Sequence, residues 1–92
     1  MSPAADRMLT ASPLPMGIDE LVARRISQRR RELRLSLATV ARGCGVSLQQ
    51  IHRYEIGANA ISVTMLWRIA QVLRTDVAYF FEDVEPLRAA SG

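Results

Sequence analysis

Apolar residues recur every three or four positions in short blocks along the central part of the chain. This spacing is typical of amphipathic helices, and no stretch alternates between apolar and polar residues as a half-buried strand does. Glycine, serine and aspartate separate the blocks, as expected of tight turns. The pattern predicts a compact all-α domain of five short helices over residues 18–84. Residues 1–17 and 85–92 lack a sustained period and are predicted to be tails.

The first predicted helix begins near Asp19, a suitable N-cap, and runs to about Leu33. Its apolar stripe contains Val22, Ile26 and Leu33. Arg30 lies four residues after Ile26 and therefore falls on the same stripe. A charge on a core-facing stripe is unfavourable unless it is paired, so Arg30 is expected to have a partner.

Both ends of the second predicted helix are marked by the sequence. Ser36 is a typical N-cap, and Gly45 suits the left-handed residue that ends a helix. Positions i, i+3, i+4 and i+7 between them form one apolar face: Leu37, Val40, Ala41 and Cys44. Val46 is expected to enter the core, and Ser47 to cap the next helix.

The third predicted helix, from about Leu48 to Glu55, has an apolar back and a largely polar front. Ile51 and Tyr54 face the core, and Gly57 ends the helix. The opposite side carries Leu48, Gln49, His52 and Arg53. A front of this kind is left free to contact a partner.

Two further helices complete the predicted domain. Ser62 caps the fourth, whose inward stripe is Val63, Leu66, Ile69, Ala70 and Leu73. Asp76 caps a short fifth helix from Val77 to about Glu82, which ends in three consecutive aromatic residues, Tyr79, Phe80 and Phe81.

The charges are unevenly distributed. From Arg24 to Arg53 there are eight arginines and one acid, Glu32, a local charge of +7, whereas residues 76–85 hold four acids and no base. The first segment is expected to attract polyanions. The 12 basic residues are all arginine. Arginine suits bidentate contacts to phosphate and guanine, although codon bias in a GC-rich genome explains the missing lysines.

Several classes of protein are disfavoured by the composition. The chain has one cysteine and one histidine, which exclude an intramolecular disulfide and a Cys/His zinc site. No glycine-rich phosphate loop and no nucleophile–base pair with an orienting third group is found. We therefore expect no enzyme activity, cofactor or metal. No membrane span or signal peptide is recognised, which favours a soluble cytoplasmic protein.

Residues 37–56 have the features that a helix-turn-helix requires. A small residue, Ala41, allows close approach of the helices; Gly45 permits the turn; Ile51 and Tyr54 anchor the second helix from behind. The segment RRISQRRRELRLSLATVARGCGVSLQQIHRYEIG, followed by ISVTMLWRIAQVLRTDVAYFF, resembles the Cro/cI-type (XRE) family of helix-turn-helix regulators over about residues 19–82. The stretch QQ-x-x-x-YE-x-G-x-N is similar to small alphaproteobacterial members.

The resemblance implies a homodimeric transcriptional regulator, most simply a repressor, that binds double-stranded DNA at a short inverted repeat. The positions that match base-reading residues are Leu48, Gln49, Gln50, His52 and Arg53. The candidates for phosphate contacts are Ser36, Leu37, Arg42, Ser47, Asn59, Arg25 and Arg29. In this family an arginine on the first helix pairs with a glutamate at the end of the recognition helix, which here implies a structural pair of Arg30 and Glu55.

The dimer seam is expected to use exposed aromatic and apolar residues. The candidates are Trp67, Tyr79, Phe80, Phe81 and Val84, although one of Phe80 and Phe81 is expected to close the core of the monomer instead. Cys44 is interpreted as a small buried hydrophobic residue.

The sequence is also compatible with two other functions. An antitoxin-like protein would bind another regulatory protein and use its DNA binding mainly for autoregulation. The DNA-binding half of a ligand-sensing regulator is less favoured, because a sensor domain has little room in 92 residues.

Overall fold

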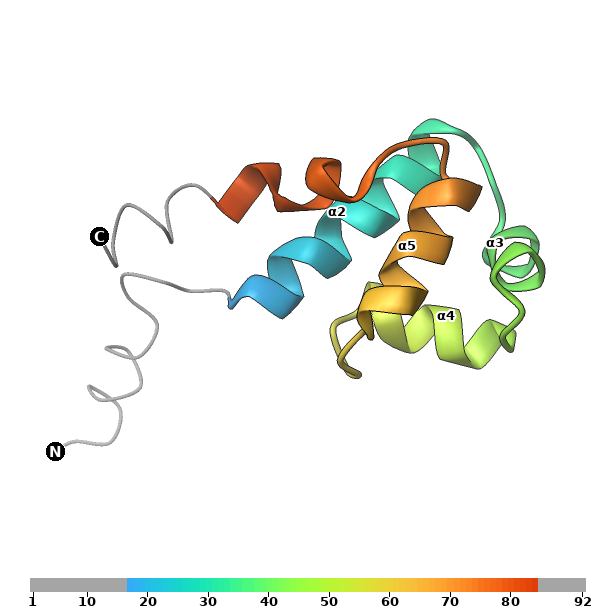
Figure 1. Cartoon of the computed structure of the whole chain (residues 1–92). Coiled ribbons are helices and arrows are strands. Elements are labelled where there is room, and N and C mark those ends of the chain that lie inside the picture. The colour runs from blue at the N-terminus through green and yellow to red at the C-terminus, as the bar shows by residue number, and fades with distance from the viewer. Residues whose placement is uncertain (1–16, 85–92) are drawn as a thin grey trace, which may run out of the picture.

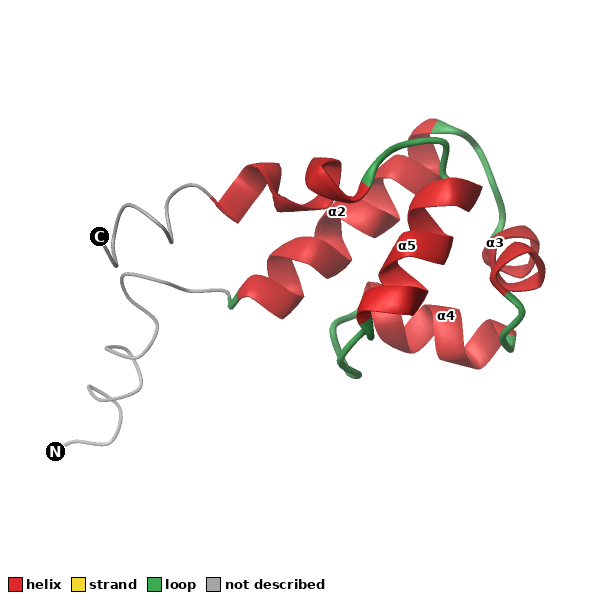
Figure 2. Cartoon of the chain, in the orientation of Figure 1, coloured by secondary structure: helices red, strands yellow, loops and turns green. Residues whose placement is uncertain are grey.

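The computed structural model describes residues 17–84, so all but Gly17 of the two predicted tails lies outside the described residues. The element order is α2 (Ile18–Glu32), α3 (Leu37–Cys44), α4 (Leu48–Glu55), α5 (Val63–Val72) and the 3₁₀ helix η1 (Val77–Val84). Figure 1 shows η1 lying along α2, whereas α3 and α4 pack together at the other end of the molecule. Figure 2 shows helices joined by short loops and no strand between residues 17 and 84. The predicted all-α, five-helix fold is confirmed.

The predicted caps begin four of the five elements. The hydroxyl oxygens of Ser36, Ser47 and Ser62 each accept a hydrogen bond from the backbone N–H three residues on, at 3.0–3.1 Å. Asp76 does the same at the start of η1, at 3.0 Å. Each bond satisfies an N–H that has no partner within its helix.

The start of α2 differs from the prediction. Gly17 is the N-cap, and its N–H donates to the Glu20 carboxylate at 2.8 Å. Asp19 therefore lies within the first turn. Its negative charge still faces the positive end of the helix dipole there, which is why an acid at this position marks the helix start without capping it.

The four α-helices end in the same left-handed turn. A backbone N–H two or three residues past each helix end donates to a carbonyl five residues earlier, at 2.9–3.0 Å, for example from Val46 to Ala41. The left-handed residue is Gly45 after α3 and Gly57 after α4, both with φ +74°. It is an arginine, Arg34 or Arg74, after α2 and α5.

A single core collects buried side chains from all five elements. It consists of Val22, Ala23, Ile26, Val40, Ala41, Cys44, Ile51, Tyr54, Leu66, Ile69, Ala70, Leu73 and Phe80. Leu33, Leu37 and Val46 pack against it as partly buried residues. Phe80 is the phenylalanine that closes the core, as η1 folds back onto α2.

Val63 is the one member of the predicted inward stripes that is exposed, at 86%. It is the first residue of α5, and a residue in the first turn can project past the elements that cover the rest of the helix.

No helix among residues 17–84 is both long and apolar enough to cross a membrane.

Candidate nucleic-acid interface

Helices α3 and α4 form a helix-turn-helix whose inner contacts follow from the sequence. Ala41 of α3 and Ile51 of α4 are both buried, and Gly45 makes the left-handed turn after α3. Gly43 gives α5 close access to α3, because a Cβ at this position would lie 2.9 Å from Cγ2 of Val72. Small residues on α3 therefore let α4 and α5 pack tightly against it. Helix α4 makes these contacts with its apolar back, and its front stays uncovered.

The front of α4 is exposed as the helical pattern predicts. Leu48, Gln49, His52 and Arg53 are exposed, and Gln50 is partly exposed. The four exposed residues and Leu37 of α3 together line one shallow depression. The structure thus brings most of the predicted base-reading residues onto one surface.

Two helix N-termini border this surface. The Ser36 hydroxyl oxygen caps α3, and that of Ser47 caps α4. Each cap satisfies one N–H of its first turn. The other early N–H groups have no partner within the helix, because no turn precedes them, and they carry a partial positive charge. Asn59 lies half-buried in the loop that leads from α4 to α5. These are suitable groups for contacts to an anion.

Arg42 lies away from the N-terminus of α3. It is in the last turn of the helix and lines a separate recess with Trp67 and Arg68 of α5. Arg68 was not a predicted site residue. Its position next to Trp67 in the sequence is a weak signal that Arg68 is exposed beside Arg42, and no motif identifies it as a site residue.

Arg25 and Arg29, two of the candidates for phosphate contacts, make contacts within the fold. Arg25 donates to the Tyr79 carbonyl at 3.2 Å and to Glu82 at 2.7 Å, and its guanidinium carbon lies 3.9 Å from the centre of the Tyr79 ring. Arg29 donates to the carbonyls of Leu73 and Arg74 at 2.9 and 3.0 Å. Both guanidinium groups therefore hold α5 and η1 to α2.

Arg30 and Glu55 form the ion pair that the family resemblance implies. Nε and Nη2 of Arg30 donate to the two carboxylate oxygens of Glu55 at 2.6 and 3.1 Å, and Nη1 donates to the Leu35 carbonyl at 2.9 Å. The two side chains are only 14% and 6% exposed. This bidentate pair fixes the C-terminal end of α4 to α2 and so sets the direction of the exposed front.

Cys44 is buried, as expected of a small hydrophobic residue. Burial raises the pKa of its thiol, and the Arg68 guanidinium opposes that rise. No group of three or more metal-ligating side chains occurs within the described part of the chain.

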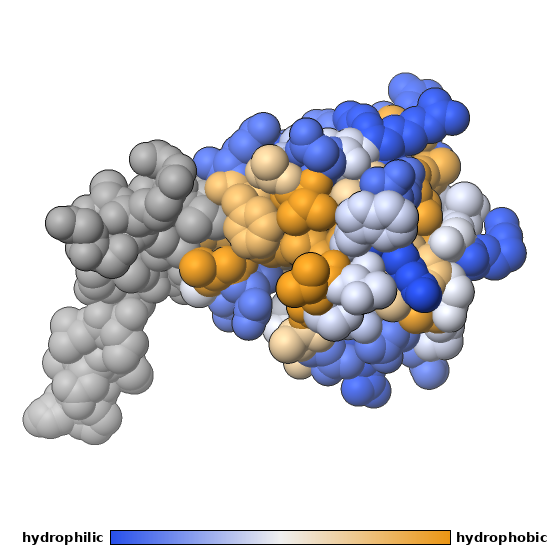
Figure 3. Space-filling view, viewed as in Figure 1, coloured by the Kyte–Doolittle hydropathy of each residue, from blue (hydrophilic) through white to orange (hydrophobic). Residues whose placement is uncertain are grey.

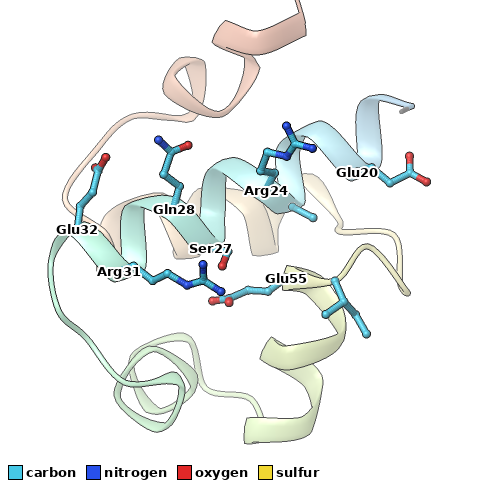
Figure 4. Close-up of a pocket in the computed structure, with 9 residues that line it drawn as sticks. Glu20, Arg24, Ser27, Gln28, Arg31, Glu32 and Glu55 are labelled. Carbon is cyan, nitrogen blue, oxygen red and sulfur yellow. The ribbon is translucent and has the colours of Figure 1, made fainter. Parts of the chain in front are cut away.

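A second groove runs between α2 and the end of α4 (Figure 4). Its lining mixes both charges: Glu20, Arg24, Arg31, Glu32 and Glu55, together with Ile56 and small or polar residues. Figure 4 shows Arg31 pointing toward Glu55. A groove with both signs of charge does not suit a polyanion, so it is not part of the candidate interface.

The model of the HTH_3 helix-turn-helix family matches residues 26–80, which is more than half of the chain. The chain belongs to this family. The regulator is 47% identical over 68 residues to a transcriptional regulator in the ATPase CF(0) region of Rhodospirillum rubrum, a match that covers 74% of this chain and 63% of the relative. Other curated relatives are HTH-type transcriptional regulators of Sinorhizobium and Rickettsia.

Two solved structures share the fold of the regulator at low sequence identity. ClgR, the clp gene regulator of Corynebacterium glutamicum, superposes with a TM-score of 0.71 at 22% identity, over 86% of this chain and 84% of that one. The restriction-modification controller protein C.AhdI of Aeromonas hydrophila gives 0.65 at 21% identity, over 67% and 94%.

The regulator spans about half to two thirds of the length of the curated relatives it matches. Within that span the family and fold agree: residues 26–80 form a helix-turn-helix domain of the HTH_3 family.

Proposed function

We propose that the regulator is a repressor that binds a short inverted-repeat operator as a homodimer, with α4 of each protomer in the major groove. The observation that carries this proposal is the exposed front of α4, where amide and guanidinium donors lie on one surface over a helix that is anchored from behind. A dimer on a repeat places its recognition helices about 34 Å apart, one turn of DNA. Such a dimer bound at a promoter blocks transcription. Because its target is chromosomal DNA, the proposed repressor acts in the bacterial cytoplasm.

The side chains on the front suit direct readout of bases. Gln49 can pair bidentately with adenine, and Arg53 with O6 and N7 of guanine. Leu48 offers an apolar contact, for example to a thymine methyl group, and Gln50 and His52 flank the two main readers. Contacts to phosphate come from the N-termini of α3 and α4 at Ser36, Leu37 and Ser47, with Asn59 and Arg42 at the margins.

The proposed dimer seam is narrower than the set of candidates from the sequence. Trp67 and Phe81 are 56% and 38% exposed, whereas Phe80 is buried and Tyr79 packs under Arg25. The side chain of Val84 lies outside the described residues. On the face seen in Figure 3, apolar surface gathers over η1 and extends toward α5. Exposed tryptophan and phenylalanine are residue types enriched at protein interfaces.

The test is immunoprecipitation of bound DNA across the genome for the wild type, Arg53→Ala and a matched control, Arg31→Ala. Arg31 is an exposed arginine of α2, so its removal changes the net charge equally. It lines the groove between α2 and α4 and not the front of α4. Discrete peaks that share an inverted repeat, lost in Arg53→Ala and kept in Arg31→Ala, support the proposal. Peaks without a shared repeat, or indifferent to Arg53, contradict it.

Binding in solution then quantifies each contact. On the recovered operator, Arg53→Ala is expected to weaken binding by about 1–3 kcal/mol and to relax preference at one base pair. Asn59→Ala is expected to weaken binding to all sequences equally, because a phosphate contact carries no base information.

A further inference from the structure

Three arginines of α2 fasten that helix to the other functional elements. Arg30 binds Glu55 of α4. Arg29 binds the last carbonyls at the end of α5, and Arg25 binds the carbonyl and ring of Tyr79 in η1, with Glu82 one turn further on. One helix therefore holds the recognition helix and both elements that carry the proposed dimer seam.

The placement of η1 depends strongly on these contacts. It is a 3₁₀ helix, whose own hydrogen bonds have poorer geometry than those of an α-helix. It packs chiefly against α2 and much less against α5, and Phe80 is its one fully buried side chain within residues 17–82. Phe80 fixes where η1 sits, Val77 and Tyr79 pack against the core as partly buried residues, and polar contacts add to these. Arg25, whose side chain is 11% exposed, makes three such contacts at once: it binds the Tyr79 carbonyl, the face of the Tyr79 ring and the Glu82 carboxylate.

We propose that Arg25 and Arg29 are positioning residues that set the spacing between the two recognition helices of the dimer. The proposal rests on the homodimer proposed above, with its seam at Phe81 of η1 and Trp67 of α5. The path from Phe81 to the DNA runs through α2: Arg25 and Arg29 hold η1 and the turn before it, and Arg30 holds α4. Trp67 is connected to α4 through α3, against which both α5 and α4 pack. In a two-fold dimer each displacement occurs in both protomers, so a loosened seam changes the separation of the recognition helices. Arg25 and Arg29 thereby select the length of the operator without contacting it.

The experiment measures affinity against operator spacing. The probes are synthetic duplexes in which the two half-sites are separated by the natural spacing or by one or two base pairs more or less, together with a duplex that carries one half-site. The proteins are the wild type, Arg25→Met and Arg29→Met. Methionine keeps an unbranched side chain over the same surface but donates no hydrogen bond.

The wild type is expected to favour one spacing by about tenfold or more over its neighbours. In either methionine variant this preference is expected to fall to about threefold or less, while affinity for the single half-site stays within about twofold of the wild type. Arg25→Lys keeps a cation beside Tyr79 and Glu82 and is expected to restore part of the preference. A purely structural role would lower half-site and full-site affinity together.

Two further variants and outcomes keep the test decisive. Glu82→Gln removes the charge of one partner of Arg25, a carboxylate that is 63% exposed, at little cost to folding, and is expected to broaden the spacing profile even if the methionine variants unfold. Unchanged profiles in folded variants, or equal losses on half-site and full operator, overturn the positioning role alone. A wild type that binds single half-sites and repeats equally well overturns the homodimer and the positioning role together.

Discussion

At the scale of single residues, the Arg30–Glu55 pair is the most consequential contact of the recognition helix. Both side chains are largely buried, and the carboxylate accepts two hydrogen bonds from one guanidinium group. A buried charge whose partner is removed keeps its desolvation penalty and loses the attraction that offset it. Selective loss of one partner should therefore disturb both stability and the direction of α4.

We predict that Glu55→Gln lowers the free energy of unfolding by roughly 3–5 kcal/mol, because Arg30 is left buried with a neutral partner. The matched control is Glu32→Gln, which removes the partner of Arg29 in a pair 3.7 Å apart and 50% exposed on the glutamate side. This control should cost about 1 kcal/mol or less. Urea unfolding of the three proteins distinguishes the two values, and equal losses would show that the Arg30–Glu55 pair behaves as a surface pair.

Cys44 gives a prediction about pH. Because burial raises the pKa of its thiol, the folded state favours the neutral form. This contribution to stability is fully present below the pKa of the unfolded thiol, about 8.5, and is lost as the pH rises through the higher pKa of the folded state. We expect the free energy of unfolding of the wild type to fall more steeply above about pH 8.5 than that of Cys44→Ala. Parallel curves for the two proteins would contradict the assignment. The folded protein should also react slowly with thiol reagents at neutral pH, and the unfolded protein quickly.

At the scale of elements, the ends of the helices show what the sequence reveals and what it conceals. Serine caps and the glycines after α3 and α4 were predictable, because each residue type has a physical reason to occupy its position. The left-handed arginines after α2 and α5 were not, because arginine has no such preference. An apolar residue directly after the turn, such as Leu35 after Arg34, is the remaining sequence signal of that motif.

Gly45 and Gly43 provide a test of two different glycine requirements. Gly45 has φ +74° and room for an added Cβ, whose nearest neighbour, Nη1 of Arg68, would be 4.0 Å away. Gly45→Ala should therefore cost about 1–2 kcal/mol through backbone strain alone, and Gly45→Asn less. At Gly43 the added Cβ would lie 2.9 Å from Val72, so the cost is steric and Val72→Ala in the same chain should recover part of it. Thermal unfolding measures both; recovery at Gly45 by Val72→Ala would refute the distinction.

The contacts that Arg25 and Arg29 make within the fold were not predictable, for a reason that belongs to the same scale. Helical periodicity and charge place an arginine on a face of α2, but neither says which element will cover that face. Only the fold shows that η1 returns along α2 and brings Tyr79 and Glu82 over these two side chains. Arg30 was placed correctly because its position on an apolar stripe demanded a partner. The local pattern thus indicated a partner for Arg30, which lies on an apolar stripe, and gave no sign of the partners of Arg25 and Arg29.

At the scale of the whole molecule, the front of α4 and the proposed seam lie on different elements, which fits a protein that recognises DNA with one surface and its own copy with another. The front was predictable because it follows from the period of one helix. The seam was less so, since five apolar candidates could not be sorted until Phe80 and Tyr79 were seen to pack within the monomer. Trp67 and Phe81 are the candidates whose side chains are seen to be exposed, and their contribution to self-association can be measured without DNA.

We predict that Trp67→Glu weakens the dimer, because a charge replaces an exposed indole at the seam, and loss of an interface tryptophan commonly costs about 2 kcal/mol or more. Sedimentation velocity over a concentration series should show a dimer for the wild type and a shift toward monomer for the variant. Ile56→Glu is the matched control, since Ile56 is similarly exposed, at 59%, but lines the groove between α2 and α4. If both variants shift toward monomer, the association is a general effect of apolar surface; if only Ile56→Glu does, the seam lies along α2 and α4 and the path through Arg25 and Arg29 cannot set the operator length.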